Sequence, residues 1–156
     1  MAHVTPVAVI GCGNPVRGDD GVGPHVVRAL VERGFAREAG VKLLDAGTDG
    51  MAVMHAAKGC RRLIVIDAVR SGSPPGAVFE VPGSELADRP PPAVTLHDFR
   101  WEHALFAGRR LYGDEFPAEV TVLLVEAQST GYGLELSPVV AAAAEKVAER
   151  VAHLLR

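Results

Sequence analysis

Cysteine is scarce in this sequence, and its scarcity argues against a scaffold stabilised by disulfides. Only Cys12 and Cys60 occur among 156 residues, whereas small secreted domains usually depend on several bridges. We interpret both cysteines as reduced thiols. The N-terminus also lacks the basic segment followed by an apolar segment that marks a signal peptide. The sequence therefore predicts a cytoplasmic protein.

Long apolar runs and a strong charge imbalance are absent as well. No run approaches the roughly 18 apolar residues that a membrane span requires, which predicts that the protein has no membrane partner. The net charge of −3 provides no basic footprint for nucleic acid. The hydrophobic content of 48% is typical of a globular chain. At this length we expect one domain that spans residues 1–156.

Several catalytic signatures are missing too. No two histidines have the HExxH spacing of zinc peptidases, and the sequence contains no CxxC pair, G-x-S-x-G elbow or phosphate-binding P-loop. The dinucleotide-binding fingerprint fails because Val16 occupies the place of its third glycine or alanine. These absences argue against the common zinc-peptidase, α/β-hydrolase and nucleotide-binding chemistries.

The most distinctive stretch that is present is a glycine-rich loop at residues 11–23. It follows an apolar run at 7–10 and precedes an amphipathic run at 25–33, a pattern that predicts a strand, a loop and a helix. Glycines allow backbone conformations that other residues resist, and they let other groups approach the chain closely. Two adjacent carboxylates, Asp19 and Asp20, end the loop where the helix is expected to begin.

The alternation of apolar runs and helical patterns predicts an α/β protein with helices on both faces of a sheet. The expected strands lie at residues 6–10, 41–44, 63–66, 78–81 and 120–125. The expected helices lie at 25–33, 51–58 and 99–112, and a last helix is capped by Ser137 with Pro138 just inside it. The proline-rich stretch 82–94 predicts a surface excursion rather than an element. The first three strands are joined by helices and should therefore be parallel, with right-handed crossovers.

Acidic residues follow the first three predicted strands. The first strand leads into the loop that carries Asp20, the second ends at Asp45, and the third ends at Asp67. Because ligands bind outside the carboxyl ends of the strands in an open parallel sheet, these acids should lie on one rim. Carboxylates gathered there would repel one another unless they share a cation. The pattern therefore predicts a metal ion or a cationic substrate group at this rim.

Each acid also has a local structural explanation. Asp20 could favour the N-terminus of a helix electrostatically. Asp45, which stands before Ala46 and Gly47, could form an Asx turn. Asp67 has fewer such roles, because a charged group at the end of a buried strand needs a partner. Function is the favoured interpretation for Asp67.

His97 and Cys12 are two further candidates. His97 leaves the proline-rich stretch beside Asp98, whereas four of the other histidines lie on predicted helices. Cys12 lies in the first loop, where it could act as a nucleophile near a histidine. A small residue packed against the sheet is the simpler interpretation of Cys12. The residues therefore leave a thiol hydrolase open as one alternative.

Four blocks of the sequence occur together in an order that is shared with a known family. They are GxGNPxxGDDGxG at 11–23, Asp-Ala-Gly-Thr-Asp-Gly at 45–50, Asp67-Ala68 after an apolar strand, and His97 after a variable loop. This combination resembles the hydrogenase maturation proteases, which trim the C-terminal extension from the large subunit of nickel–iron hydrogenases. The resemblance extends over residues 7–155, and Leu-Ser-Pro at 136–138 opens the last helix as in relatives. Ala46 departs from the glycine that is common in the family, and some relatives have glutamate in place of Asp20.

The resemblance implies a fold and a metal site. The implied fold is a three-layer α/β/α arrangement around a mostly parallel, mixed five-stranded twisted sheet. By position, Asp20, Asp67 and His97 are the implied metal ligands. The implied metal is nickel that is carried by the substrate precursor, and other divalent ions such as cadmium or zinc are expected to act as surrogates. Two carboxylates and one imidazole can hold a divalent ion with open coordination positions.

The resemblance also implies an activity. The chain is expected to be an endopeptidase that removes the C-terminal extension of a nickel–iron hydrogenase large-subunit precursor, its partner, after nickel insertion. Asp20 and Asp67 are the implied catalytic residues, and Asp45 is a candidate for a supporting or general-base role. Backbone N–H groups at Gly47 and Thr48 are candidates for binding the substrate. The alternative is a non-enzymatic α/β domain that binds a metal or a cationic ligand.

Overall fold

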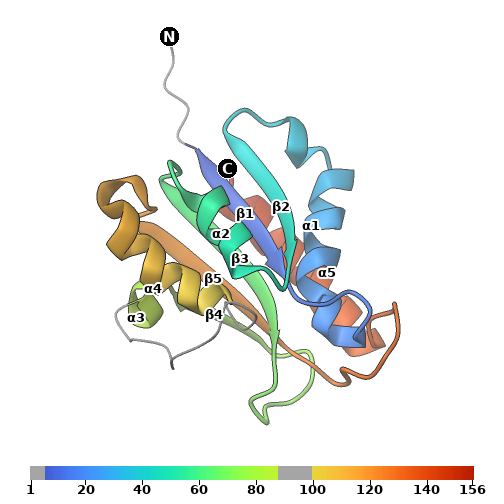
Figure 1. The fold of residues 1–156 in the computed structure, drawn as a ribbon. Coiled ribbons are helices and arrows are strands. Elements are labelled where there is room, and N and C mark those ends of the chain that lie inside the picture. Colours follow the sequence, from blue (N-terminus) through green and yellow to red (C-terminus); the bar gives the residue numbers. More distant parts are fainter. Residues whose placement is uncertain (1–5, 88–99) are drawn as a thin grey trace.

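A twisted five-stranded sheet forms the centre of the structure (Figure 1). The computed structural model describes residues 6–87 and 100–156. The strands are β1 (Val7–Cys12), β2 (Val41–Gly47), β3 (Arg62–Val69), β4 (Val78–Pro82) and β5 (Glu119–Glu126). Their order is β2-β1-β3-β5-β4, and only β4 runs antiparallel to its neighbour. The predicted parallel arrangement of the first three strands is confirmed.

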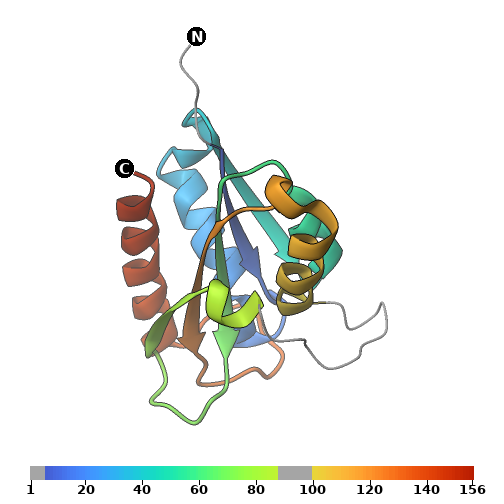
Figure 2. The same cartoon turned by 90° about the vertical axis from the view of Figure 1, so that its left-hand side faces the viewer.

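Helices cover both faces of the sheet. They are α1 (Val22–Glu32), α2 (Gly50–Ala57), α3 (Ser84–Ala87), α4 (Trp101–Tyr112) and α5 (Pro138–Leu154), with short 3-10 turns at η1 (Gly18–Gly21), η2 (Phe35–Arg37) and η4 (Gly113–Glu115). On one face α1 packs against α5, and on the other α2 packs against α4 (Figure 2). The predicted three-layer α/β/α architecture is confirmed. Within the described ranges, no helix is long and apolar enough to cross a membrane.

Strand β1 is buried along its whole length because its side chains alternate between two apolar cores. Val7 and Val9 face the core that includes α1 and α5, whereas Ala8 and Ile10 face the core that includes α2 and α4. A near-continuous apolar run is expected of a parallel strand that is covered on both faces. The glycine-rich loop that follows β1 therefore starts at the carboxyl edge of the sheet, between the ends of β2 and β3.

Two details of the fold differ from the sequence-based expectation. Strand β2 continues to Gly47, so that Asp45 lies within the strand and pairs with Gly11. Residues 84–87 form α3, so the prediction that 82–94 contains no element is wrong for this part. The prolines of this stretch stand at its ends, and the proline-free segment between them has room for one helical turn. Residues 88–94 lie outside the described part of the chain.

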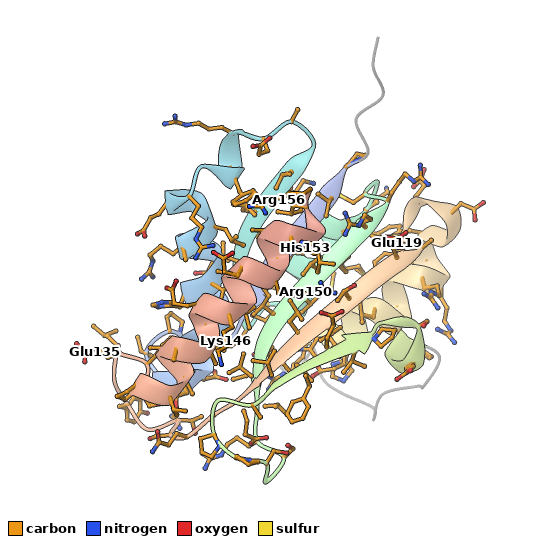
Figure 3. All side chains as sticks on the ribbon, turned by 180° about the vertical axis from the view of Figure 1, so that it is seen from behind. Glu119, Glu135, Lys146, Arg150, His153 and Arg156 are labelled. Carbon is orange, nitrogen blue, oxygen red and sulfur yellow. The ribbon has the colours of Figure 1, made fainter. Side chains whose placement is uncertain are left out.

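Helix α5 runs along the back face of the sheet (Figure 3). Arg150 forms a two-pronged ion pair with Glu80 of the edge strand β4, with N···O distances of 2.7 and 3.0 Å. Exposed ion pairs of this kind contribute roughly 0–1 kcal/mol. Burial of Val140, Val147 and Val151 is therefore the main stabilisation of α5 on the sheet.

Glycines allow the loop between β1 and α1 to pass very close to its neighbours. A Cβ on Gly23 would overlap the carbonyl oxygens of Cys12 and Ile66, so the start of α1 rests directly on β1 and β3. A Cβ on Gly13 would overlap the carbonyl oxygen of Asp20 and would lie 3.4 Å from Oδ1 of Asp67. The backbone of Asp20 and the carboxylate of Asp67 thus both lie next to Gly13.

Gly13→Ala is expected to lower the free energy of unfolding by about 3 kcal/mol or more. Gly13 has a φ of 128°, and an added methyl group would also collide with the Asp20 carbonyl. Gly34→Ala is the matched control, because Gly34 has a φ of 89° but faces open space. That variant should lose about 1 kcal/mol from backbone strain alone. Chemical denaturation measures the free energy of unfolding of both variants. Equal losses would contradict the expected collision with the Asp20 carbonyl.

Candidate active site

The loops at the carboxyl end of the sheet enclose an open cleft of about 460 Å³. These loops gather at the lower end of the view in Figure 1. Polar residues from five segments line the cleft, namely Asn14, Arg17, Asp20, Thr48, Arg70, Arg100 and Thr130. The parallel order β2-β1-β3 brings the ends of three acid-bearing strands to this edge.

Asp20 is half-buried and lines the cleft. Its Oδ2 accepts a hydrogen bond from the backbone N–H of Asn14 at 2.8 Å. This bond closes the glycine-rich loop on itself and orients the carboxylate. Because the carboxylate of Asp20 makes only this one hydrogen bond to the described residues, it retains lone pairs for a ligand.

Asp67, at the end of β3, is buried with only 2% of its surface exposed. Its carboxylate accepts hydrogen bonds from Trp101 Nε1 and from the backbone N–H of Ala68, both at 2.8 Å. Burial raises the pKa of Asp67 from 3.8 to about 7, although these bonds and Arg100 act in the opposite direction. The charge of Asp20 adds to the rise in this pKa, so the two acids sense each other electrostatically.

Arg100 connects Asp67 with the cleft. Its Nη2 lies 3.5 Å from Oδ2 of Asp67, and its side chain forms part of the cleft lining. A buried carboxylate needs a compensating positive charge, and Arg100 supplies it. Within residues 6–87 and 100–156, no group of three or more His, Cys, Asp or Glu side chains is arranged to hold a metal ion. His97 lies outside the described residues, so its role as a ligand stays a prediction.

Asp67→Asn is expected to make the protein more stable above pH 7. Because the native carboxyl has a pKa of about 7 against 3.8 for an ordinary aspartate, the native state binds more protons than the unfolded state between these values. Wild-type stability therefore falls as the pH rises from about 4 to about 7, by up to about 4 kcal/mol. Because asparagine does not titrate, the stability of the variant does not fall in this way as the pH rises. Denaturation at pH 5 and pH 8 measures the difference, and a less stable variant at pH 8 would contradict the expectation.

Asp19, the neighbour of Asp20, is almost fully buried and binds a different segment of the chain. It accepts hydrogen bonds from the backbone N–H groups of Gln128, Ser129 and Ser137 and from the Ser137 hydroxyl. Burial by itself would raise the pKa of Asp19, but these hydrogen bonds lower it below its ordinary value. Asp19 therefore anchors the glycine-rich loop to the segment that leads into α5.

Ser137 stands at the N-cap position of α5, as predicted, with Pro138 directly after it. The prediction that its side chain caps the helix is wrong, because the structure shows no such bond from Ser137 to the helix. The hydroxyl donates to Asp19 instead. Donation to a carboxylate is a strong, charge-assisted hydrogen bond, and it turns the hydroxyl toward Asp19 and away from the first turn of α5.

The segment 45–48 borders the cleft. The exposed carboxylate of Asp45 accepts a hydrogen bond from the Gly47 N–H at 2.9 Å, which forms the Asx turn that was one interpretation of the sequence. The Gly47 carbonyl accepts from the Gly13 N–H at 2.7 Å and joins the two loops. Of this segment, only Thr48 lines the cleft. The predicted roles of Asp45 in catalysis and of Gly47 and Thr48 in substrate binding stay predictions.

Both cysteines are free thiols and are buried. Cys12 is 5% exposed, and burial, followed by the charges of Asp67 and Glu102, raises the pKa of its thiol well above the ordinary value. The thiolate, which is the nucleophilic form, is therefore strongly disfavoured at neutral pH. This environment argues against a thiol hydrolase that uses Cys12.

Sequence reasoning missed two residues that contact Asp67, namely Arg100 and Trp101. Both lie at the start of α4, more than thirty residues after Asp67, so no local pattern connects them with β3. One signal was available, because Trp101 is the only tryptophan. A buried indole N–H usually has a polar partner.

Comparison with known proteins points in one direction. A family model described as hydrogenase maturation protease matches residues 24–154. The chain is 29% identical over 153 residues to the hydrogenase expression/formation protein HoxM of Cupriavidus necator, covering 96% of this chain and 74% of HoxM. It is also 29% identical over 151 residues to the hydrogenase 2 maturation protease of Escherichia coli, covering 96% and 90% of the two chains. Among solved structures, the hydrogenase maturating endopeptidase HybD of E. coli superposes with a TM-score of 0.79 at 26% identity, covering 97% of this chain and 92% of HybD.

Proposed function

We propose, from the fact that this chain belongs to the hydrogenase maturation protease family, that it removes the C-terminal extension from the large-subunit precursor of a nickel–iron hydrogenase. Cleavage follows nickel insertion and takes place in the cytoplasm, where free thiols such as Cys12 and Cys60 stay reduced. The partner of the enzyme is the precursor, which brings the nickel with it.

One observation carries this proposal, which is the electrostatic coupling of the buried Asp67 to Asp20, an acid that lines the cleft. The backbone of Asp20 and the carboxylate of Asp67 both adjoin Gly13, and the charge of Asp20 contributes to the raised pKa of Asp67. Two carboxylates that repel each other in this way favour a shared cation. Arg100 compensates Asp67 in part at 3.5 Å, and a divalent ion would satisfy both carboxylates together.

The donor set fits an ion that arrives with a second protein. Two carboxylates and His97 are few ligands for a resident transition metal, whereas soft thiolates on the precursor would supply the rest of the nickel coordination. Docking therefore brings Asp20, Asp67 and His97 to open positions on an ion that the precursor already holds. An empty precursor offers no ion to dock against, so the same residues select the nickel-loaded form.

The cleft then positions the scissile peptide for attack by water. A divalent ion near the carbonyl polarises it or lowers the pKa of a bound water. Asp20 is open to the cleft and accepts only the Asn14 N–H among the described residues, so it can orient that water or accept its proton. Thr48 lines the same cleft and is placed to donate to a substrate oxygen.

Cleavage of matched precursors tests the proposal. Large-subunit precursor is prepared with and without nickel and is incubated with the purified protein, and mass spectrometry measures loss of the extension. The nickel-loaded precursor should be trimmed and the nickel-free precursor should stay intact. Equal trimming of both forms would reject selection by the metal. Binding of the loaded precursor without any cleavage would favour the non-enzymatic alternative.

A further inference from the structure

Two arginines on one side of the cleft are held by the same residue. Arg17 Nε donates to the carbonyl oxygen of Thr130 at 3.0 Å, and Arg70 Nη1 donates to the Thr130 hydroxyl at 2.8 Å. Arg17 comes from the loop after β1, Arg70 from the loop after β3, and Thr130 from the loop after β5. All three line the cleft. The two guanidinium groups are therefore fixed next to each other at its wall.

Arg17 is further ordered by its surroundings. Its guanidinium lies over the ring of Tyr132 with 4.6 Å to the centroid. Its loop pairs with the loop after β5 through the Gly18 N–H to Gly133 carbonyl bond and the Gly133 N–H to Val16 carbonyl bond, both at 2.9 Å. The partners of the Arg17 side chain are a ring face and a neutral carbonyl. Because neither carries a negative charge, the charge of Arg17 is not balanced by them.

Neither Arg17 nor Arg70 has an acidic partner in the part of the chain that the structure describes. The third cleft arginine, Arg100, is paired with Asp67. Asp20 is the only acid among the described residues that line the cleft. This side of the cleft is therefore positive, although the whole chain carries a net charge of −3.

We propose that Arg17 and Arg70 form an anion subsite that binds a carboxylate of the extension peptide during cleavage. The inference rests on the proposed function, because it names a specificity element of the same cleft. The planar guanidinium group matches the two oxygens of a carboxylate and forms paired charge-assisted hydrogen bonds with it. Each arginine has N–H donors left after its bond to Thr130.

The extension is the part of the precursor that fits this subsite. A cleft of about 460 Å³ has the size of pockets that enclose small ligands, so it admits a short extended segment and not a folded surface. Carboxylates in such a segment come from aspartate or glutamate side chains or from the chain terminus. Asp20 lines the same cleft and belongs to the proposed metal site, so Arg17 and Arg70 are available to bind the peptide.

Binding of short peptides tests the subsite without any need for cleavage. The probes are acetyl-Ala-Asp-Ala-Asp-Ala-amide, the same peptide with Asn in place of Asp, and the Asn peptide with a free terminal carboxylate. NMR of backbone amide shifts at Thr130 and Arg70 measures binding at low salt. The Asp peptide should bind at least about tenfold more tightly than the neutral one, and added salt should weaken it. The third probe shows whether a terminal carboxylate suffices.

Arg17→Gln and Arg70→Gln should each reduce binding of the acidic peptide about tenfold. Arg110→Gln is the matched control, because Arg110 also stacks on a ring and donates to a backbone carbonyl but lies in α4 outside the cleft lining. It should bind like the wild type. Equal binding of the acidic and neutral peptides, or no binding of either at the solubility limit, would overturn the subsite.

The same protein separates the two proposals. If it cleaves nickel-loaded precursor but does not discriminate between the peptides, the subsite is wrong and the protease assignment stands. If it binds the acidic peptide through Arg17 and Arg70 but cleaves no precursor, the anion-binding arginines stand and the protease assignment fails. If it cleaves precursor and discriminates, neutralising the acids of the extension should also slow cleavage about tenfold.

Discussion

Asp20→Asn and Asp67→Asn should each slow the cleavage of nickel-loaded precursor by at least about 100-fold. Asparagine keeps the shape of the side chain but removes the negative charge, and a neutral amide is a poorer ligand for a divalent ion. Loss of outer-shell partners alone costs up to about 100-fold, so loss of a ligand should cost at least as much. Single-turnover cleavage with excess protein measures the effect and separates it from product release.

Asp114→Asn provides the control for this experiment. Asp114 is exposed in η4, at the opposite end of the sheet from the cleft, and its variant should cleave at the wild-type rate. His97→Ala belongs in the same series and tests the ligand predicted from sequence. If Asp20→Asn and Asp67→Asn both process the loaded precursor as fast as Asp114→Asn, the two acids are not the metal-binding pair.

Asp19→Ala should lower the free energy of unfolding by about 3 kcal/mol or more. The change removes the acceptor for three backbone N–H groups and a hydroxyl, and each buried donor left without a partner costs about 1–3 kcal/mol. The expected fall in melting temperature is about 10 °C. Thermal and chemical denaturation measure these values.

The adjacent variants Asp19→Asn and Asp20→Asn form a matched pair with opposite readouts. Asp19→Asn should lose stability, because its amide N–H₂ meets donors rather than acceptors. Asp20→Asn should lose activity with little change in stability. The lowered pKa of Asp19 also means that its stabilisation is present above about pH 4 and is lost as the pH falls through that lowered value. A stable Asp19→Asn protein would show that the buried contacts of Asp19 are dispensable.

Sequence periodicity was sufficient to predict most of the fold. The apolar pattern located all five strands within a few residues, and it is most continuous in β1, β3 and β5 because buried parallel strands require continuous apolar sequence. The family resemblance implied a mixed sheet, but neither it nor periodicity identified β4 as the antiparallel edge strand. The short helix α3 was missed because the surrounding prolines dominated the interpretation.

The candidate site could be predicted only where a reactive side chain directly follows a predicted strand. Asp67 was accessible to sequence reasoning because a charge after four buried apolar residues has few structural roles. The contacts of Arg100 and Trp101 with Asp67 were not accessible, since they join segments far apart in the sequence. The different orientations of Asp19 and Asp20 also depend on the irregular backbone of one loop, which no pattern of residue types encodes.

The anchoring of Asp19 means that neither half of the polypeptide encodes the reactive centre alone. An N-terminal fragment that ended at Ala87 would contain Asp20 and Asp67. The loop after β1, which carries Asp19 and Asp20, would however lack the amide donors of 128–137. A C-terminal fragment would contain those donors but would lack their acceptor, the carboxylate of Asp19. Split versions of the chain should therefore regain activity only when both pieces assemble, because the hydrogen bonds to Asp19 form only between the two pieces.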